Sequence, residues 1–262
     1  MRFKFKLHYQ GFSRTVLVML SILCVWTLFG QEESTESSKT CNYIRSQVKT
    51  EFYGEDNSLQ SKEVGIDELW TRENEAAQLS NQRVSYLNTG TNQLIIIDLQ
   101  FNAYISTSLP LKLENILQEG KLLEYQKETI TGTVTPLKET RVILGLKCQG
   151  YQVTMIRKKP GSDPTQDKMT VWATTDVPFD IKPHDQLLDN LRILYNRDEK
   201  LRGELKTIKG LQMRIENPRT RDGKEITYIS EVVEISRKLP PYNNIDEFVK
   251  AKGLIKVEKL IP

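Results

Sequence analysis

The stretch that decides the fold is KETRVILGLKCQGYQVTMI, residues 138–156. Before Gly150 its apolar side chains occupy even-numbered positions: Val142, Leu144, Leu146 and Cys148. After Gly150 they occupy odd-numbered positions: Tyr151, Val153 and Met155. Because successive side chains of a β-strand point to opposite faces, this switch needs one inserted residue. We therefore expect a long, bent central strand, or two adjoining strands, with a bulge or tight corner at Gln149 and Gly150.

The sequence on either side predicts further strands. Runs rich in β-branched and aromatic residues, separated by polar breaks, are expected to form strands at residues 41–53, 69–70, 83–87, 93–99, 102–109, 128–135, 169–174, 211–215 and 226–239. The run QLIIIDL at 93–99 is apolar on both faces, which indicates a central strand. The fold class that we predict is α+β: a strongly curved antiparallel sheet, or incomplete β-barrel, with two or three covering helices.

One amphipathic helix is predicted from about His184 to Leu205. Its apolar stripe consists of Leu187, Leu191, Leu194, Leu201, Leu205 and Ile208. Asp185 is placed to cap its start, and Gly210 to end it. Shorter helices are expected within 111–124 and within 240–253. The long helix must cover an apolar surface, and the concave face of the sheet is the natural one.

The first 30 residues have the layout of a secretory signal. Four basic residues precede an uncharged apolar run that extends from residue 15 to residue 30: Arg2, Lys4, Lys6 and Arg14. The run is shorter than the roughly 20 residues that span a bilayer, so cleavage near Gly30 is favoured over a permanent N-terminal membrane anchor. We expect a signal peptide at 1–30, a flexible linker at 31–40 and a single exported domain at 41–262, located in the periplasm or cell envelope.

The charge of the chain excludes a nucleic-acid partner. The whole chain carries 37 Lys and Arg residues against 34 Asp and Glu residues. Its first 30 residues hold four of the basic residues and no acid, so the remainder has a net charge of −1. The sequence pI of about 8.6 therefore reflects the targeting segment, and no basic surface for nucleic acid remains.

Two cysteines remain after the signal, Cys41 and Cys148. In an oxidising compartment such a pair is a disulfide candidate, and the alternative is two buried thiols. Cys24 lies within the signal, and a lipoprotein anchor there ranks third because Leu23, instead of a small residue, precedes it. A nucleophilic role for Cys148, with Lys147 or His184 as its base, is weaker than a disulfide or core role.

The sequence predicts no enzyme, no cofactor and no metal site. Outside the signal, His184 is the single histidine, and no CxxC pair is present. There is no G-x-S-x-G elbow, no phosphate-binding or dinucleotide glycine motif and no EF-hand loop. A pair of carboxylates suited to glycoside hydrolysis has no positive signal in the sequence.

A ligand cavity is the main functional expectation from the pattern. Trp172 and Tyr151 lie on predicted strands, and the leucines of the long helix would cover the concave face. The predicted lining is Trp172, Tyr151, Leu187, Leu191 and Leu194. For the two aromatic residues themselves, ordinary core packing is favoured and the cavity lining is the alternative interpretation. A curved sheet under a helix can leave space for an apolar ligand.

Four segments carry a family resemblance: ILGLKCQGYQVT (143–154), VWATTDVP (171–178), LKTIKGLQMRIE (205–216) and IDEFVKAKGLIKV (245–257). Their order resembles that of an uncharacterised domain family of exported bacterial proteins, which is similar to the LolA/LolB lipoprotein carriers. The resemblance implies a LolA-like half-barrel over 41–262 with helices as a lid. The last segment departs from the family ending F-x-x-P-x-G-Y, since Lys250 and Leu254 stand in place of Pro and Tyr.

The expected function is that of a non-catalytic cell-envelope binding protein. It would hold a lipid, a lipoprotein acyl chain or another apolar ligand in the concave face of the half-barrel. The alternative is a structural or partner-binding envelope protein whose concavity is filled by its own side chains. A connected cavity under the helix favours the first function, and a close-packed interior favours the second. No transmembrane span is expected in the mature chain.

Overall fold

The structure, a computed structural model, describes residues 41–54, 56, 58–119, 129–195, 198–221, 224–240 and 244–259, without the side chains of residues 194, 195, 221 and 224. The predicted signal peptide and linker, 1–40, lie outside these residues. The first strand begins at Cys41, where the sequence predicts the start of the folded part. No helix in the described part of the chain is both long enough and apolar enough to cross a bilayer.

The described residues form one sheet of twelve strands with short helices around it. The strands are β1 (Cys41–Tyr53), β2 (Leu59–Arg72), β3 (Glu75–Ser80), β4 (Arg83–Asn88), β5 (Gln93–Asp98), β6 (Ala103–Ser108), β7 (Thr129–Ile143), β8 (Leu146–Lys158), β9 (Thr165–Thr174), β10 (Leu211–Arg221), β11 (Lys224–Lys238) and β12 (Ile255–Lys256). The helices are α2 (Leu113–Ile116), α4 (Lys182–Tyr195), α5 (Glu199–Leu205) and α6 (Ile245–Ala251).

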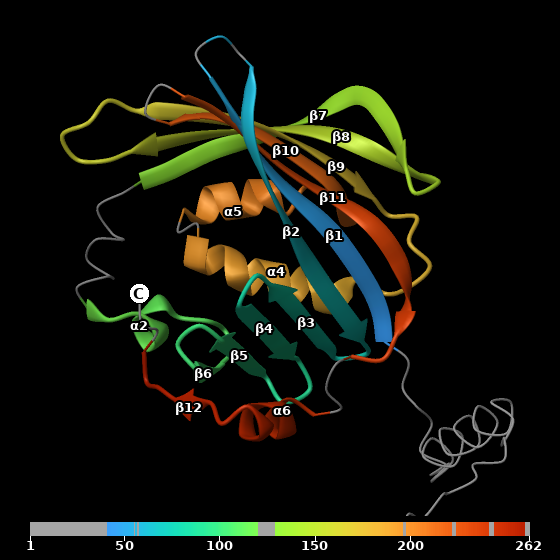
Figure 1. Cartoon of the computed structure of the whole chain (residues 1–262), viewed down its shortest axis with the longest axis vertical. Helices are drawn as coiled ribbons and strands as arrows, with labels where there is room; N and C mark the ends of the chain where they lie inside the picture. The colour runs from blue at the N-terminus through green and yellow to red at the C-terminus, as the bar shows by residue number, and fades with distance from the viewer. Residues whose placement is uncertain are drawn as a thin grey trace, which may run out of the picture. The chain divides into compact units, whose positions relative to one another are not determined.

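The sheet is antiparallel and open. Its strand order is β12-β6-β5-β4-β3-β2-β1-β11-β10-β9-β8-β7, so β12 and β7 are its two edges. Only the pairing of β12 with β6 is parallel among the described strands. Figure 1 shows the sheet curling around α4 and α5, with β3–β6 on one side of these helices and β7–β11 on the other. The predicted curved antiparallel sheet with covering helices is confirmed at this level.

Strand β5 is buried on both faces, as its sequence predicts. Leu94 and Ile96 belong to the main core cluster, which includes the leucines of α4. Ile95 and Ile97 point to the other face and pack in the cluster that includes α6. All four side chains are at most 1% exposed. The centre of this limb of the sheet is therefore covered by a helix on each side, which excludes water from β5.

The stretch 138–156 forms two adjoining antiparallel strands at the edge of the sheet. β7 ends at Ile143 and β8 begins at Leu146. Leu144 and Gly145 make the turn between them, with φ angles of 50° and 78°. These are left-handed values, which glycine adopts most readily and which suit a two-residue hairpin turn. Of the two arrangements expected from the sequence, the pair of adjoining strands is correct and the single central strand is wrong.

The bulge predicted at Gln149 and Gly150 is wrong. β8 pairs with β9 in unbroken register through both residues, and the register shift in this region lies on β7. The apolar positions switch because the two halves of β8 are buried on different faces. Cys148 belongs to the main core cluster, whereas Val153 belongs to the cluster around α5.

The single helix predicted from 184 to 205 is two helices, α4 and α5. Asp198 precedes α5 and accepts a hydrogen bond from the backbone N–H of Leu201 at 2.7 Å. This N-cap begins a new helix, so the leucine spacing that predicts one continuous helix spans two. Asp185 lies in the first turn of α4 and not at its cap. Its negative charge there is still favourable to the helix dipole.

The two helices cover different parts of the concave face. In α4, Leu187 and Leu191 are buried in the main core, over β2–β4. In α5, Leu201 and Leu205 are buried with residues of β8 and β9, and α5 packs on β7. The apolar stripe predicted for one helix is therefore divided between two separate clusters.

No disulfide bond joins Cys41 to Cys148, so the predicted bridge is corrected. Cys41 opens β1 and packs with Tyr43 and Trp70, whereas Cys148 lies on β8. Strands β11, β10 and β9 stand between these two strands in the sheet. At about 4.8 Å per strand step, the separation far exceeds the Cα distance of about 6 Å that a disulfide spans.

Candidate functional site

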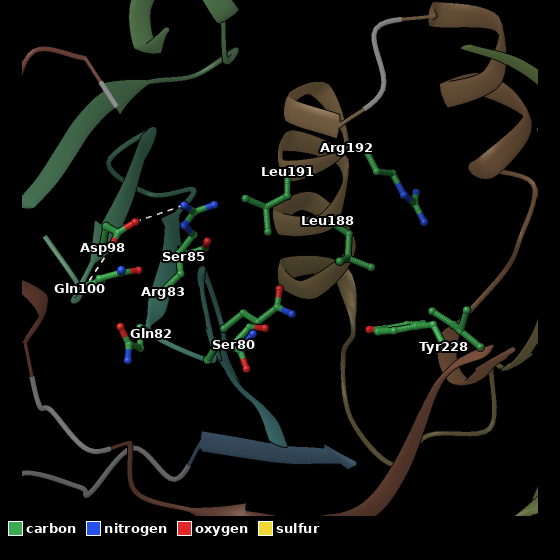
Figure 2. A pocket seen from close by; sticks show the side chains of 13 residues that line it. Ser80, Gln82, Arg83, Ser85, Asp98, Gln100, Leu188, Leu191, Arg192 and Tyr228 are labelled. Carbon is green, nitrogen blue, oxygen red and sulfur yellow. Dashed lines mark hydrogen bonds and ion pairs between the residues drawn. The ribbon is translucent and has the colours of Figure 1, made fainter. Parts of the chain in front are cut away.

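A cavity of about 1080 Å³ lies inside the curve of the sheet, beside α4. One wall comes from β3–β5 and their turns, one from α4 and one from β10 and β11, as Figure 2 shows. Its lining residues are Gln78, Ser80, Asn81, Gln82, Arg83, Ser85, Asp98, Gln100, Leu188, Leu191, Arg192, Ile215 and Tyr228. This volume is slightly above the range of about 300 to 1,000 Å³ that is typical of cavities for small organic ligands, so it is large enough for one.

The wall formed by β4 and β5 is polar and internally paired. Arg83 and Asp98 are directly opposite each other in the register of the two strands. Nη2 of Arg83 lies 3.2 Å from Oδ2 of Asp98, and the other oxygen of Asp98 accepts a backbone hydrogen bond from Gln100 at 3.1 Å. The Arg83 side chain is largely exposed, so this ion pair is screened by water and orders the rim more than it stabilises the fold.

The wall formed by α4 is mainly apolar. In Figure 2 the Leu191 side chain points towards β4 and Leu188 points towards Tyr228. Ile215 on β10 and the ring of Tyr228 on β11 complete the apolar side. At the end of the helix, Nη1 of Arg192 lies 3.0 Å from Oδ1 of Asp189. The cavity thus presents apolar surface on one side and paired charges on the other.

A smaller cavity of about 180 Å³ adjoins the large one. The two share Gln78, Leu188, Ile215 and Tyr228 in their linings. The smaller one is lined further by Ile44, Ser46, Asp67, Glu68, Leu69, His184, Leu211, Gln212, Ser230 and Val232. It lies over β1, β2 and β11 at the middle of the sheet, so the combined space extends from the polar rim towards the centre of the concave face.

Burial shifts the titration of two groups in the smaller cavity. It raises the pKa of Asp67, and a hydrogen bond donated by the Ser80 hydroxyl partly offsets the rise. Burial also raises the pKa of Tyr228, and the nearby charge of Asp67 adds to the effect. Nδ1 of His184 lies 3.2 Å from Oδ1 of Asp185, yet the angle allows no hydrogen bond.

The structure places the predicted lining residues at different locations. Leu191 lines the large cavity, and Leu187 is fully buried in the core beneath α4. Tyr151 is paired with Val171 across β8 and β9 and packs in the cluster around α5. Trp172 follows Val171 and therefore points to the opposite face of the sheet from Tyr151. The side chain of Leu194 lies outside the described residues.

Sequence reasoning missed the residues that give the cavity its chemistry, above all Asp67 and Tyr228. Both lie on long strands in which exposed and inward positions each carry a mixture of polar and apolar residues. The one available signal is Asp67, which lies two residues before Leu69 and so on the same face of β2. A charged residue at an inward position of a strand is unusual.

Neither a metal centre nor a known family identifies the site. Within the described ranges, no three His, Cys, Asp or Glu side chains lie close enough together to hold a metal ion. A scan against models of protein families finds no match, and a search of curated proteins finds no significant one. What the protein binds is therefore inferred from the cavity and its side chains.

Proposed function

We propose that this protein is an exported, non-catalytic binding protein that holds a lipid-like molecule in the concave face of its open sheet. The cavity of about 1080 Å³ beside α4 is the observation that carries this proposal. The sequence resemblance to the LolA/LolB carriers supports this proposal. It implies an open antiparallel barrel with a helical lid, and the described sheet is antiparallel and open. The signal-like first 30 residues support an envelope location.

The walls of the cavity suit an amphiphilic ligand. A hydrocarbon chain would lie against Leu188, Leu191 and Ile215, where it loses contact with water. The polar part of the same molecule would face the side chains of β3–β5, which retain hydrogen-bonding groups towards the cavity. A purely apolar ligand would leave these groups without water or partners, which is unfavourable.

The test is binding of a neutral amphiphile by the purified mature protein. Monolaurin is titrated by calorimetry, and native mass spectrometry of freshly purified protein detects any lipid that is already bound. Wild type is expected to bind monolaurin at a ratio of one to one. Ser85 is buried and lines the cavity, so Ser85→Phe fills part of the space and weakens binding.

The matched control is Ser108→Phe, which adds the same ring at an exposed position at the end of β6. This variant should bind monolaurin as wild type does. Wild-type protein that carries no lipid and binds no monolaurin would contradict the proposal. It would favour the alternative of a partner-binding envelope protein without a ligand. Equal loss of binding in both variants would also count against the cavity as the site.

A further inference from the structure

The concave face contains a carboxylate that has no cationic partner. Asp67 on β2 stands between Ser46 on β1 and Ser80 on β3 in the register of the sheet. All three positions line the cavities beside α4. The hydroxyl of Ser80 donates a hydrogen bond to Asp67, and in the described part of the chain no Lys or Arg side chain forms an ion pair with it.

The acidic groups at the rim of the large cavity are paired. Asp98 binds Arg83 at 3.2 Å, and Asp189 lies 3.0 Å from Arg192. These pairs leave the rim electrically balanced. Of the two acids that line the smaller cavity, Glu68 accepts a hydrogen bond from the Tyr43 hydroxyl at 2.5 Å, whereas Asp67 is half-buried and no described side chain compensates its charge. A half-buried carboxylate without a counter-charge is unfavourable in the empty protein.

A second buried polar group in the lining of the small cavity lacks a hydrogen-bond partner. His184 lines the same small cavity, is 7% exposed, and has no hydrogen-bond partner at Nδ1. An unsatisfied buried polar atom is uncommon in folded proteins and calls for an explanation. The unpartnered His184 nitrogen, in the same lining as the uncompensated Asp67 carboxylate, indicates that a bound group with several donors belongs here.

A primary ammonium group matches this environment. It carries a positive charge and three N–H donors, so it can neutralise Asp67 and donate to neighbouring oxygen and nitrogen atoms at once. A hydroxyl group offers a single donor and no charge. A carboxylate or phosphate would be repelled by Asp67, and the arginines at the rim are already paired.

We propose that Asp67 is the anchor of a subsite for the ammonium group of an amine-bearing amphiphile. The chain of this ligand lies along Leu188 and Ile215, which both line the two adjoining cavities. The inference rests on the proposed binding function and names the head group that the same cavity selects. Tyr228 lines both cavities, and Figure 2 shows its ring at the edge of the large one.

The test compares three probes with the same chain and different head groups. Dodecylamine, dodecanol and dodecanoate are titrated at neutral pH, below their micelle concentrations, into the mature protein. Wild type is expected to bind dodecylamine about 10-fold more tightly than dodecanol, as one charge-assisted hydrogen bond implies. Dodecanoate should bind more weakly than dodecanol. This comparison needs no variant.

Asp67→Asn then assigns the preference to one carboxylate. It keeps the shape of the side chain and removes its charge, so dodecylamine should lose its advantage over dodecanol and dodecanoate should bind better. Asp246→Asn is the control, because Asp246 is exposed on α6 away from the cavity. It should retain the wild-type order of the three probes.

The outcomes separate the subsite from the binding function. If dodecanol binds but dodecylamine binds no more tightly, the ammonium subsite is refuted and the lipid-binding function stands. If dodecylamine is preferred equally in wild type and Asp67→Asn, the anchor is not Asp67 and the proposal fails. If none of the probes binds, both the subsite and the proposed function fail.

Discussion

Ser80 and Asp67 are directly opposite each other on β3 and β2, and the hydroxyl of Ser80 donates a hydrogen bond to the carboxylate of Asp67. This bond lowers the pKa of Asp67, but the desolvation caused by burial is larger and raises it above the ordinary value. The folded protein therefore holds a proton at Asp67 more tightly than the unfolded chain does. The pH dependence of stability follows from this difference.

Asp67→Asn should make the empty protein more stable at neutral pH. Because the folded-state pKa is raised, ionised Asp67 lowers the free energy of unfolding. The penalty is absent below the ordinary Asp pKa, grows as pH rises through the raised pKa, and then stays constant. Urea unfolding of both proteins between acidic and neutral pH measures this.

The control for that experiment is Asp98→Asn, which breaks the 3.2 Å pair with Arg83. This variant should lose stability at neutral pH, by about 0 to 1 kcal/mol, as is usual for an exposed ion pair. The two changes at cavity-lining aspartates should thus have opposite signs. A loss of stability in Asp67→Asn at neutral pH would contradict the assignment of an uncompensated buried charge.

Asp198→Ala should weaken the start of α5. The substitution removes the 2.7 Å hydrogen bond to the backbone N–H of Leu201, and an N-cap of this kind contributes about 1 kcal/mol. Chemical unfolding should show that loss. Asp163 lies exposed in the loop between β8 and β9, and Asp163→Ala should change stability by less than about 0.5 kcal/mol. Similar values for the two variants would show that the cap does not hold α5 in place.

Cys148 should react as a thiol only after unfolding. Its side chain is fully buried, and burial raises its pKa, so both access and thiolate formation are suppressed in the folded protein. Alkylation without reductant, followed by peptide mass spectrometry, should leave the Cys148 peptide unlabelled in native protein and label it in urea. A peptide that is labelled in urea only after reduction would restore the disulfide that the sequence first suggests.

The sheet could be predicted from sequence because its strands carry local patterns. Leu94 to Ile97 are apolar at every position, and burial on both faces of β5 follows directly from that. The helix from 184 to 205 was predicted as one element because leucine spacing continues across Asp198. Its division depends on a cap hydrogen bond, and a capping residue inside a continuous apolar stripe is easily overlooked.

A cavity could be predicted, but the polar side chains that line it could not, and β2 shows why. On this strand Val64 and Ile66 are 58% and 50% exposed, while Asp67 faces the cavity. Alternation assigns the apolar positions to the inside, and here that assignment is inverted. The inversion depends on where α4 crosses the sheet, a long-range contact that no local pattern encodes. The parallel pairing of β12 with β6 is hidden for the same reason.

Gly132→Ala should be strongly destabilising, because the backbone of β8 lies against this glycine of β7 and Leu201 of α5 packs over it. An added Cβ would overlap the carbonyl oxygen of Thr154 on β8 and would lie 3.2 Å from Cδ1 of Leu201. The backbone of a paired strand cannot move aside without losing its hydrogen bonds, so a loss of stability of at least about 1 to 3 kcal/mol is expected.

Gly203 provides the opposite case within α5 itself, since a Cβ there meets nothing within 4 Å. Gly203→Ala should therefore raise stability by about 0.5 to 1 kcal/mol through helix propensity. Thermal and urea unfolding of both variants measure the difference, and a tolerated Gly132→Ala would contradict the close approach of the β8 backbone to Gly132 that the structure shows.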